Sequence, residues 1–355
     1  MFRPKLLFTS LAALALGACA PQDPQAQVTA ALSEQVILPT YNRWVEADRA
    51  LARSAVAYCS GQIDLQQAHA DFFAAQKAWA ELQPLLVGPL AEGNLAWRVQ
   101  FWPDKKNLVQ RQVEQLLKAN PGIDAAALEK ASVVVQGLTA YEYILFDPQI
   151  EQTDAATRQR YCPLLEAIGA RQQHLAESIL ASWTAKDGMA AQLSKFPNNR
   201  YAESKEAIAE LLRVQITAID TLKKKLGAPL GRQTKGIPQP YQAEAWRSAT
   251  SLANVGAALA SAESLWRGGK DGKGLRDLLG SEQQDLAARI DAAYAEASGK
   301  LQALEPPLTE LLASPAGVAQ ANDFYDSLNR LHRLQEIELA KALNVQLGFN
   351  ANDGD

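Results

Sequence analysis

Apolar residues recur three and four positions apart along most of this chain. After Asp64, the large residues Phe72, Trp79 and Leu82 follow that spacing, which places them on one face of a helix. No run of alternating apolar and polar residues reads as a strand. The pattern therefore predicts an all-α protein, with helices over residues 28–38, 41–59, 65–82, 107–119, 124–147, 153–183, 204–226, 242–266, 281–304 and 318–347.

Proline and glycine mark the expected breaks in this pattern. Pro39 interrupts the first helical segment, and Thr40 is a candidate cap for the helix that follows. Pro163 is expected to kink the long helix over residues 153–183. Residues 186–199 are predicted to form a loop, and residues 226–240, rich in glycine and proline, a long connection.

Residues 133–147 form an apolar run that carries an acid, Glu142, inside it. A buried acid needs a cation, a hydrogen-bond donor or a proton. Thr139 precedes Glu142 by three residues and so shares its helix face. Two interpretations of Glu142 stay open: a pocket carboxylate that binds a cation or a ligand, or a structural acid paired with Arg98 or Arg247.

A weak internal similarity suggests that the chain has two related halves. Residues 138–145 resemble residues 259–266, and each segment has a glutamate at its fifth position, although short alanine-rich matches also arise by chance. We predict an N-terminal helical bundle over residues 28–200 and a C-terminal bundle over residues 201–355, related by duplication.

The first residues have the layout of a bacterial secretory signal. Arg3 and Lys5 precede an apolar run over residues 6–16, which is shorter than the roughly 20 residues that a membrane span needs. The run ends at Leu-Gly-Ala-Cys19, the pattern of a lipoprotein processing site. The sequence thus predicts a signal peptide over residues 1–18, lipidation of Cys19 and a polar tether over residues 19–27.

The expected location of the protein and its net charge limit the classes of partner that it can bind. Ala20 follows Cys19 in place of the aspartate that signals inner-membrane retention, so we expect a lipoprotein on the periplasmic side of the outer membrane or on the cell surface. The formal net charge is −4, and removal of Arg3 and Lys5 with the signal lowers it to −6. Such an acidic protein is not expected to bind nucleic acid, and its expected membrane contact is the lipid anchor alone.

Two cysteines remain once Cys19 is lipidated. Cys59 and Cys162 would lie in a compartment that permits disulfides, so we predict that they are bonded to each other. Histidine occurs at only three positions, each in an ordinary helical context, without His-Glu-x-x-His or Cys-x-x-Cys spacing. We therefore expect no tightly held zinc.

Residues 95–107 combine aromatic and charged side chains at unusual density. Arg98, Trp102 and Asp104 lie there, and Pro103 stops any helix. Because amphipathic side chains serve both roles, the segment predicts either a pocket wall or a packed junction.

At Gly137-Leu-Thr-Ala-Tyr-Glu142 the chain resembles the imelysin family of bacterial envelope proteins, which is marked by Gly-x-His-x-x-Glu. Thr139 stands where that motif has histidine. The resemblance covers nearly the whole mature chain, through residues 101–107, Cys59, Tyr161-Cys162 and residues 204–207, 244–248 and 347–355.

The resemblance implies two helical bundles related by duplication, with a pocket between them that the motif lines. It also implies a link to iron acquisition, and the family is named after an insulin-cleaving metallopeptidase. Because a threonine hydroxyl is a weak ligand compared with imidazole, we expect the pocket without the peptidase activity. We expect six residues to converge in this pocket and bind the ligand: Arg98, Trp102, Asp104, Thr139, Glu142 and Arg247.

Three functions stay open at this stage. The favoured one is a non-catalytic ligand-binding or accessory lipoprotein for uptake of iron or an iron complex, which would hold a small ligand, iron or another divalent cation and contact other envelope proteins of iron uptake. The alternative is a metallopeptidase in which Glu142 and other carboxylates hold a metal ion. The third is a scaffold for another envelope protein, which would expose a large apolar patch.

Overall fold

The computed structural model describes residues 23–270, 272–305 and 307–346, and all regular elements within these ranges are helices. The predicted fold class, all-α, is confirmed. None of the described helices is long and apolar enough to cross a membrane. The predicted signal peptide over residues 1–18 and the predicted lipidation site Cys19 lie outside the described residues.

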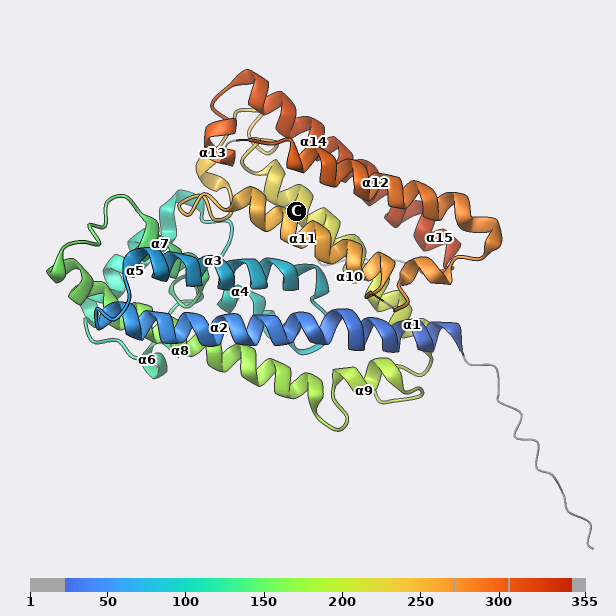
Figure 1. The fold of residues 1–355 in the computed structure, drawn as a ribbon, viewed down its shortest axis with the longest axis horizontal. Coiled ribbons are helices and arrows are strands. Elements are labelled where there is room, and N and C mark those ends of the chain that lie inside the picture. Colours follow the sequence, from blue (N-terminus) through green and yellow to red (C-terminus); the bar gives the residue numbers. More distant parts are fainter. Residues whose placement is uncertain (1–22, 271, 306, 347–355) are drawn as a thin grey trace, which may run out of the picture.

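The helices before residue 200 are arranged around α2. This helix packs against α3 on one side and along the long α8 on the other, and Figure 1 shows α2 and α8 running together through the lower part of the molecule. The helices of this part are α1 (Pro24–Leu32), α2 (Leu38–Cys59), α3 (Leu65–Leu82), α4 (Ala96–Val99), α5 (Leu108–Ala119), α6 (Ala125–Glu129), α7 (Leu138–Phe146), α8 (Ala155–Thr184) and α9 (Met189–Ser194).

The later helices pack mainly on one another. α10 contacts α11 and α14, and α14 also packs against α12, which Figure 1 shows at the upper edge of the molecule. α11 also packs against α3, and α10 against α1, so the two parts of the chain share an interface. The predicted boundary near residue 200 falls between α9 and the second set of helices, which are α10 (Ser204–Gly227), α11 (Ser251–Arg267), α12 (Gln284–Gln302), α13 (Leu308–Leu311), α14 (Pro315–Arg333) and α15 (Ala340–Ala342). The duplication stays a prediction.

The first helix begins inside the segment that was predicted to be a tether. Asp23 accepts a hydrogen bond from the backbone N–H two residues later at 2.9 Å, and Pro24 stands in the first turn, where a missing N–H costs nothing. Residues 24–27 are therefore helical. Pro39 does not interrupt the next helix, because a π-helical segment over Ser33–Ile37 leads directly into α2, with the proline in its first turn.

The apolar run around Glu142 contains two helical pieces where one was predicted. A 3₁₀ turn over Val133–Val135 comes first, and α7 begins after Gly137. A Cβ atom on Gly137 would lie 2.2 Å from the carbonyl oxygen of Val99, so a larger residue would force these backbones apart. The glycine thereby lets the first turn of α7 lie directly against the end of α4.

The start of α11 also differs from the prediction. Residues 243–250 were expected to be helical, but they form a loop in which Ala245 and Ala249 have φ values of 52° and 58°. Non-glycine residues rarely adopt this left-handed conformation, and such residues often occur at functional sites. This loop, called the 243–250 loop below, carries Arg247 towards α7.

The predicted disulfide is confirmed. Cys59, at the end of α2, is bonded to Cys162 in α8, with an S–S distance of 2.07 Å. The bond joins two helices that pack along each other, and the bulky core residues Trp44 and Trp183 are fully buried on these same helices. It thus reinforces the layer on which α3 and α7 rest.

Candidate functional site

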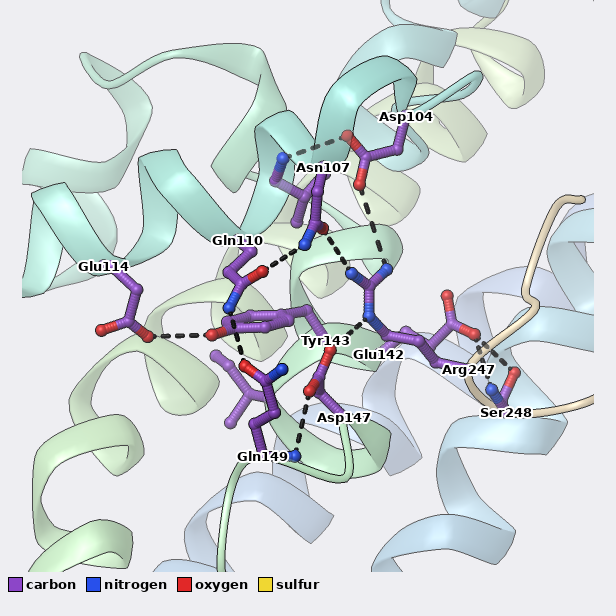
Figure 2. A network of polar contacts seen from close by, with 12 residues as sticks. Asp104, Asn107, Gln110, Glu114, Glu142, Tyr143, Asp147, Gln149, Arg247 and Ser248 are labelled. Atoms are coloured by element: carbon purple, nitrogen blue, oxygen red, sulfur yellow. Dashed lines mark hydrogen bonds and ion pairs between the residues drawn. The ribbon is translucent and has the colours of Figure 1, made fainter. Parts of the chain in front are cut away.

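Glu142 is buried and is met by hydrogen-bond donors. Its side chain projects from α7 towards the 243–250 loop, where Oε1 accepts hydrogen bonds from the backbone N–H and from the Oγ–H of Ser248, both at 2.8 Å (Figure 2). Burial raises the pKa of this carboxyl, while the two bonds from Ser248 and the charge of Arg247 act in the opposite direction. Glu142 therefore ties α7 to the segment that precedes α11.

Arg247 lies beside this contact and has its own acidic partners. Its side chain is only 1% exposed; Nε donates to Oδ2 of Asp147 at 2.9 Å, and Nη2 donates to Oδ1 of Asn107 at 2.6 Å (Figure 2). Oδ2 of Asp104 lies 3.9 Å from Nη1. The guanidinium also lies 4.3 Å from the centre of the Trp246 ring. One cation thus joins the start of α5, the end of α7 and the 243–250 loop.

Three more predicted residues support this junction. Thr139 donates from Oγ1 to the carbonyl oxygen of Phe101 at 2.9 Å. Asp104 accepts hydrogen bonds from two backbone N–H groups at the start of α5, at 2.7 and 3.1 Å. Trp102 donates from Nε1 to the carbonyl oxygen of Gln242 at 3.0 Å, across a gap of 140 residues. Through these contacts the segment over residues 95–107 is a packed junction, and it is also a pocket wall, because Trp97 and Trp102 line a groove.

Arg98 does not join the others. Within the described residues, its guanidinium makes no hydrogen bond or ion pair with Glu142, and the contact that holds this position is a hydrogen bond from Nε2 of Gln172 to its carbonyl oxygen, at 2.9 Å. Burial is the main cause of the lowered pKa of Arg171, and the positive charge of Arg98 lowers it further. The backbone at the end of α4 is thus held against α8.

Trp102 also lines a groove between the two parts of the chain. It has a volume of about 470 Å³ and is bounded by α3 and the segment around α4 on one side and by α10 on the other. Of the six predicted residues, Trp102 alone lines it, while Asp104 lines a separate cavity of about 750 Å³ beside Trp246. The aromatic and polar residues that line the groove include Trp79, Gln83, Trp97, Gln100, Trp102, Arg213, Thr217, Thr221, Lys225 and Glu244.

A buried ion pair forms part of the wall of this groove. Nζ of Lys225, on α10, lies 2.5 Å from Oε1 of Glu244, and the two side chains are only 6% and 3% exposed. Lys225 also donates to the side-chain oxygen of Gln83, whose Nε2 donates to Oε1 of Gln100 at 2.8 Å. Burial lowers the pKa of Lys225, and the charge of Glu244 opposes this shift.

Glu244 keeps one oxygen free of partners. Oε2 is buried and accepts no hydrogen bond from the part of the chain that the structure describes. A buried carboxylate oxygen without a donor is costly, and a hydroxyl or amide N–H of a ligand in the groove would remove that cost. This oxygen distinguishes the groove from the junction around Arg247, where the charges are matched within the protein.

Comparison with known proteins identifies the family. The model of the imelysin family matches residues 37–335. The chain belongs to the imelysin family. Two solved structures share its fold: an imelysin-like protein from Psychrobacter arcticum 273-4, with a TM-score of 0.76 and 20% sequence identity, and a precursor of iron-regulated protein A from Parabacteroides distasonis, with a TM-score of 0.72 and 16% identity. Each comparison covers 92% of this chain and 97% of the other. No curated protein matches the sequence.

This imelysin differs from the family motif at the position that the resemblance singled out. Thr139 occupies the place of the motif histidine, and its hydroxyl group donates a hydrogen bond to the backbone carbonyl oxygen of Phe101. Within the described residues, no three His, Cys, Asp or Glu side chains gather closely enough to share a metal ion. Glu142, the candidate metal ligand, uses Oε1 to hold the 243–250 loop.

The sequence interpretation missed Lys225 and Glu244. Both had a visible signal: Lys225 interrupts the apolar face of α10 next to the buried Leu222 and Leu226, and Glu244 opens one of the segments that resemble the family. A charged residue on an apolar helix face calls for a buried partner. The identity of that partner depends on which loop packs over the end of α10.

Proposed function

We propose that this imelysin is a non-catalytic lipoprotein of the bacterial envelope that binds a small ligand in the groove and assists the acquisition of iron or an iron complex. The observation that carries the proposal is the groove itself, which is lined by the exposed Trp97, by Trp102, by the largely buried Trp79 and by a buried ion pair with one carboxylate oxygen that has no partner. Ligand sites have this composition, mostly apolar with a few polar groups, and volumes of about 300–1,000 Å³.

The junction around Arg247 supports the groove. Glu142 and Arg247 hold the 243–250 loop through Ser248 and Asp147, and Glu244 begins that same loop. The motif carboxylate therefore acts as a positioning residue, since it places Glu244 against Lys225. A metal-binding role for Glu142 would compete with the two hydrogen bonds from Ser248.

The link to iron is carried over from the relatives. One structural neighbour is named an iron-regulated protein, and the family resemblance points the same way. The expected export signal and the expected lipid anchor at Cys19 would place the groove in the envelope, which iron or an iron complex must cross during uptake. An accessory role would bring contacts with other envelope proteins of iron uptake.

A variant that fills the groove tests this function. Thr217, half-buried on α10, faces the groove, so Thr217→Trp should block it without disturbing the core. Lys224→Trp, on the exposed face of the same helix, is the matched control. In a deletion strain under iron limitation, the control should restore growth and Thr217→Trp should not, with both proteins folded and equally abundant. Equal growth with the two variants contradicts the proposal.

The peptidase alternative has its own assay. Purified wild-type protein should not hydrolyse a denatured polypeptide. Hydrolysis that a chelator stops and that Glu142→Ala removes would replace the binding function with a peptidase function.

A further inference from the structure

The charged residues of the groove differ in what they already bind. Glu210 accepts a hydrogen bond from Nη2 of Arg200 at 2.8 Å, and Lys225 and Glu244 hold each other. Arg213, half-buried on α10 and facing the same groove, makes no hydrogen bond or ion pair with any side chain or carbonyl that the structure describes. The groove therefore contains one positive charge without a counterion.

Two hydroxyl groups continue from this charge along α10. Thr217 and Thr221 follow Arg213 at intervals of four residues, so the three side chains lie in one row that faces the groove. Neither hydroxyl hydrogen-bonds within the described chain, although threonine in a helix commonly bonds back to the preceding turn. With a rise of 1.5 Å per residue, the row from Arg213 to Lys225 extends about 18 Å.

The wall opposite this row is aromatic. Trp102 donates its indole N–H group to the carbonyl of Gln242 at 3.0 Å, so it offers ring surface and no free donor to the groove. Trp79 borders the groove as well, but it is only 2% exposed and its indole N–H group is donated to Gln100 at 2.8 Å. Trp97 is 43% exposed, unusually so for a tryptophan, and lies at the same wall. Indole faces favour contact with a flat, unsaturated group.

We infer that the ligand of this groove is an extended organic anion. Its acid group pairs with Arg213, its flat unsaturated body lies between the indoles and the threonine row, and a hydroxyl or amide N–H at its far end donates to Oε2 of Glu244. A bare metal cation does not suit the site, because the unpaired charge of Arg213 and the ammonium of Lys225 both repel it. This inference rests on the proposed function, since it names the ligand class of the same groove.

A set of three probes tests this ligand class. The first is a biphenyl with a carboxylate at one end and a hydroxyl at the other, the second lacks the hydroxyl, and the third lacks the carboxylate. Binding is measured by tryptophan fluorescence and calorimetry on the full mature chain. The first probe should bind best, and loss of the carboxylate should weaken binding at least tenfold, as expected for a hydrogen-bonded charge pair.

Two variants assign the ends of the probe. Arg213→Gln should weaken the two carboxylate probes about tenfold and leave the hydroxyl-only probe unchanged, whereas Lys224→Gln, which removes the same charge from the exposed face of α10, should weaken none. The double variant Lys225→Met/Glu244→Leu removes the buried pair together, so no unpaired charge is left behind. It should weaken only the probes that carry the hydroxyl.

The outcomes separate this inference from the proposed function. If the probes bind equally and Arg213→Gln changes nothing, the groove does not select anions and the inference is wrong. If no probe binds at millimolar concentration while Thr217→Trp still abolishes growth, the ligand class is wrong and the proposed function stands. If the probes bind as expected but the strain that carries Thr217→Trp grows normally, the ligand class stands and the proposed function fails.

Discussion

Replacement of Arg247 by methionine should cost about 4 kcal/mol of unfolding free energy, within the roughly 3–5 kcal/mol that breaking a buried ion pair costs. Methionine keeps the apolar stem and much of the packing on Trp246, so the loss is mainly electrostatic. Asp147, whose side chain is 7% exposed, would keep only the backbone N–H of Gln149 as a donor, at 3.1 Å. Asp104 would keep its two bonds to α5 and contribute little.

Urea unfolding at neutral pH, followed by tryptophan fluorescence and circular dichroism with the disulfide intact, measures this cost. The double variant Arg247→Met/Asp147→Asn should recover about half of the loss, because asparagine is neutral and can still accept from Gln149. Arg289→Met, which breaks an exposed pair with Glu338 on the far side of the molecule, is the control and should leave the midpoint nearly unchanged. If Arg247→Met destabilises no more than this control, the junction does not hold the 243–250 loop.

Three further predictions concern other parts of the chain. Since burial raises the pKa of Glu142, the folded protein binds the proton of this carboxyl more tightly than the unfolded chain does. The stability advantage of wild type over Glu142→Gln should therefore shrink as the pH rises from the ordinary pKa of glutamate, near 4.5, through the raised pKa. An advantage that grows over this range would contradict the shift. Removing the disulfide by Cys59→Ala with Cys162→Ala should cost roughly 4–5 kcal/mol in urea unfolding, as expected for a loop of 103 residues, and a change below about 1 kcal/mol would show that the unfolded chain is already constrained. Cys19→Ser should abolish lipidation, and mass spectrometry of the wild-type mature N-terminus that finds an unmodified residue there would refute the anchor.

The features that the sequence alone predicted depend on neighbours along the chain or on small numbers of candidates. Helical periodicity is local, so α3 and α8 were predicted within a few residues of their observed bounds. The disulfide followed because Cys59 and Cys162 were the one pair left after Cys19. The burial of Glu142 followed from the apolar residues on every side of it, and the family followed from the motif that ends at Glu142 together with the other segments that resemble the family.

The partners of these residues were decided by tertiary structure. Glu142 was expected to need a cation, a hydrogen-bond donor or a proton, and the tertiary structure supplies Ser248 as the donor. Ser248 belongs to the loop in which Ala245 is left-handed, and nothing in local sequence predicts a left-handed alanine. Gly137 was visible, yet its role depends on the backbone of Val99 passing within reach. Lys225 and Glu244 meet because the 243–250 loop folds over α10, and a pairing between separate elements depends on how they pack, which periodicity does not encode.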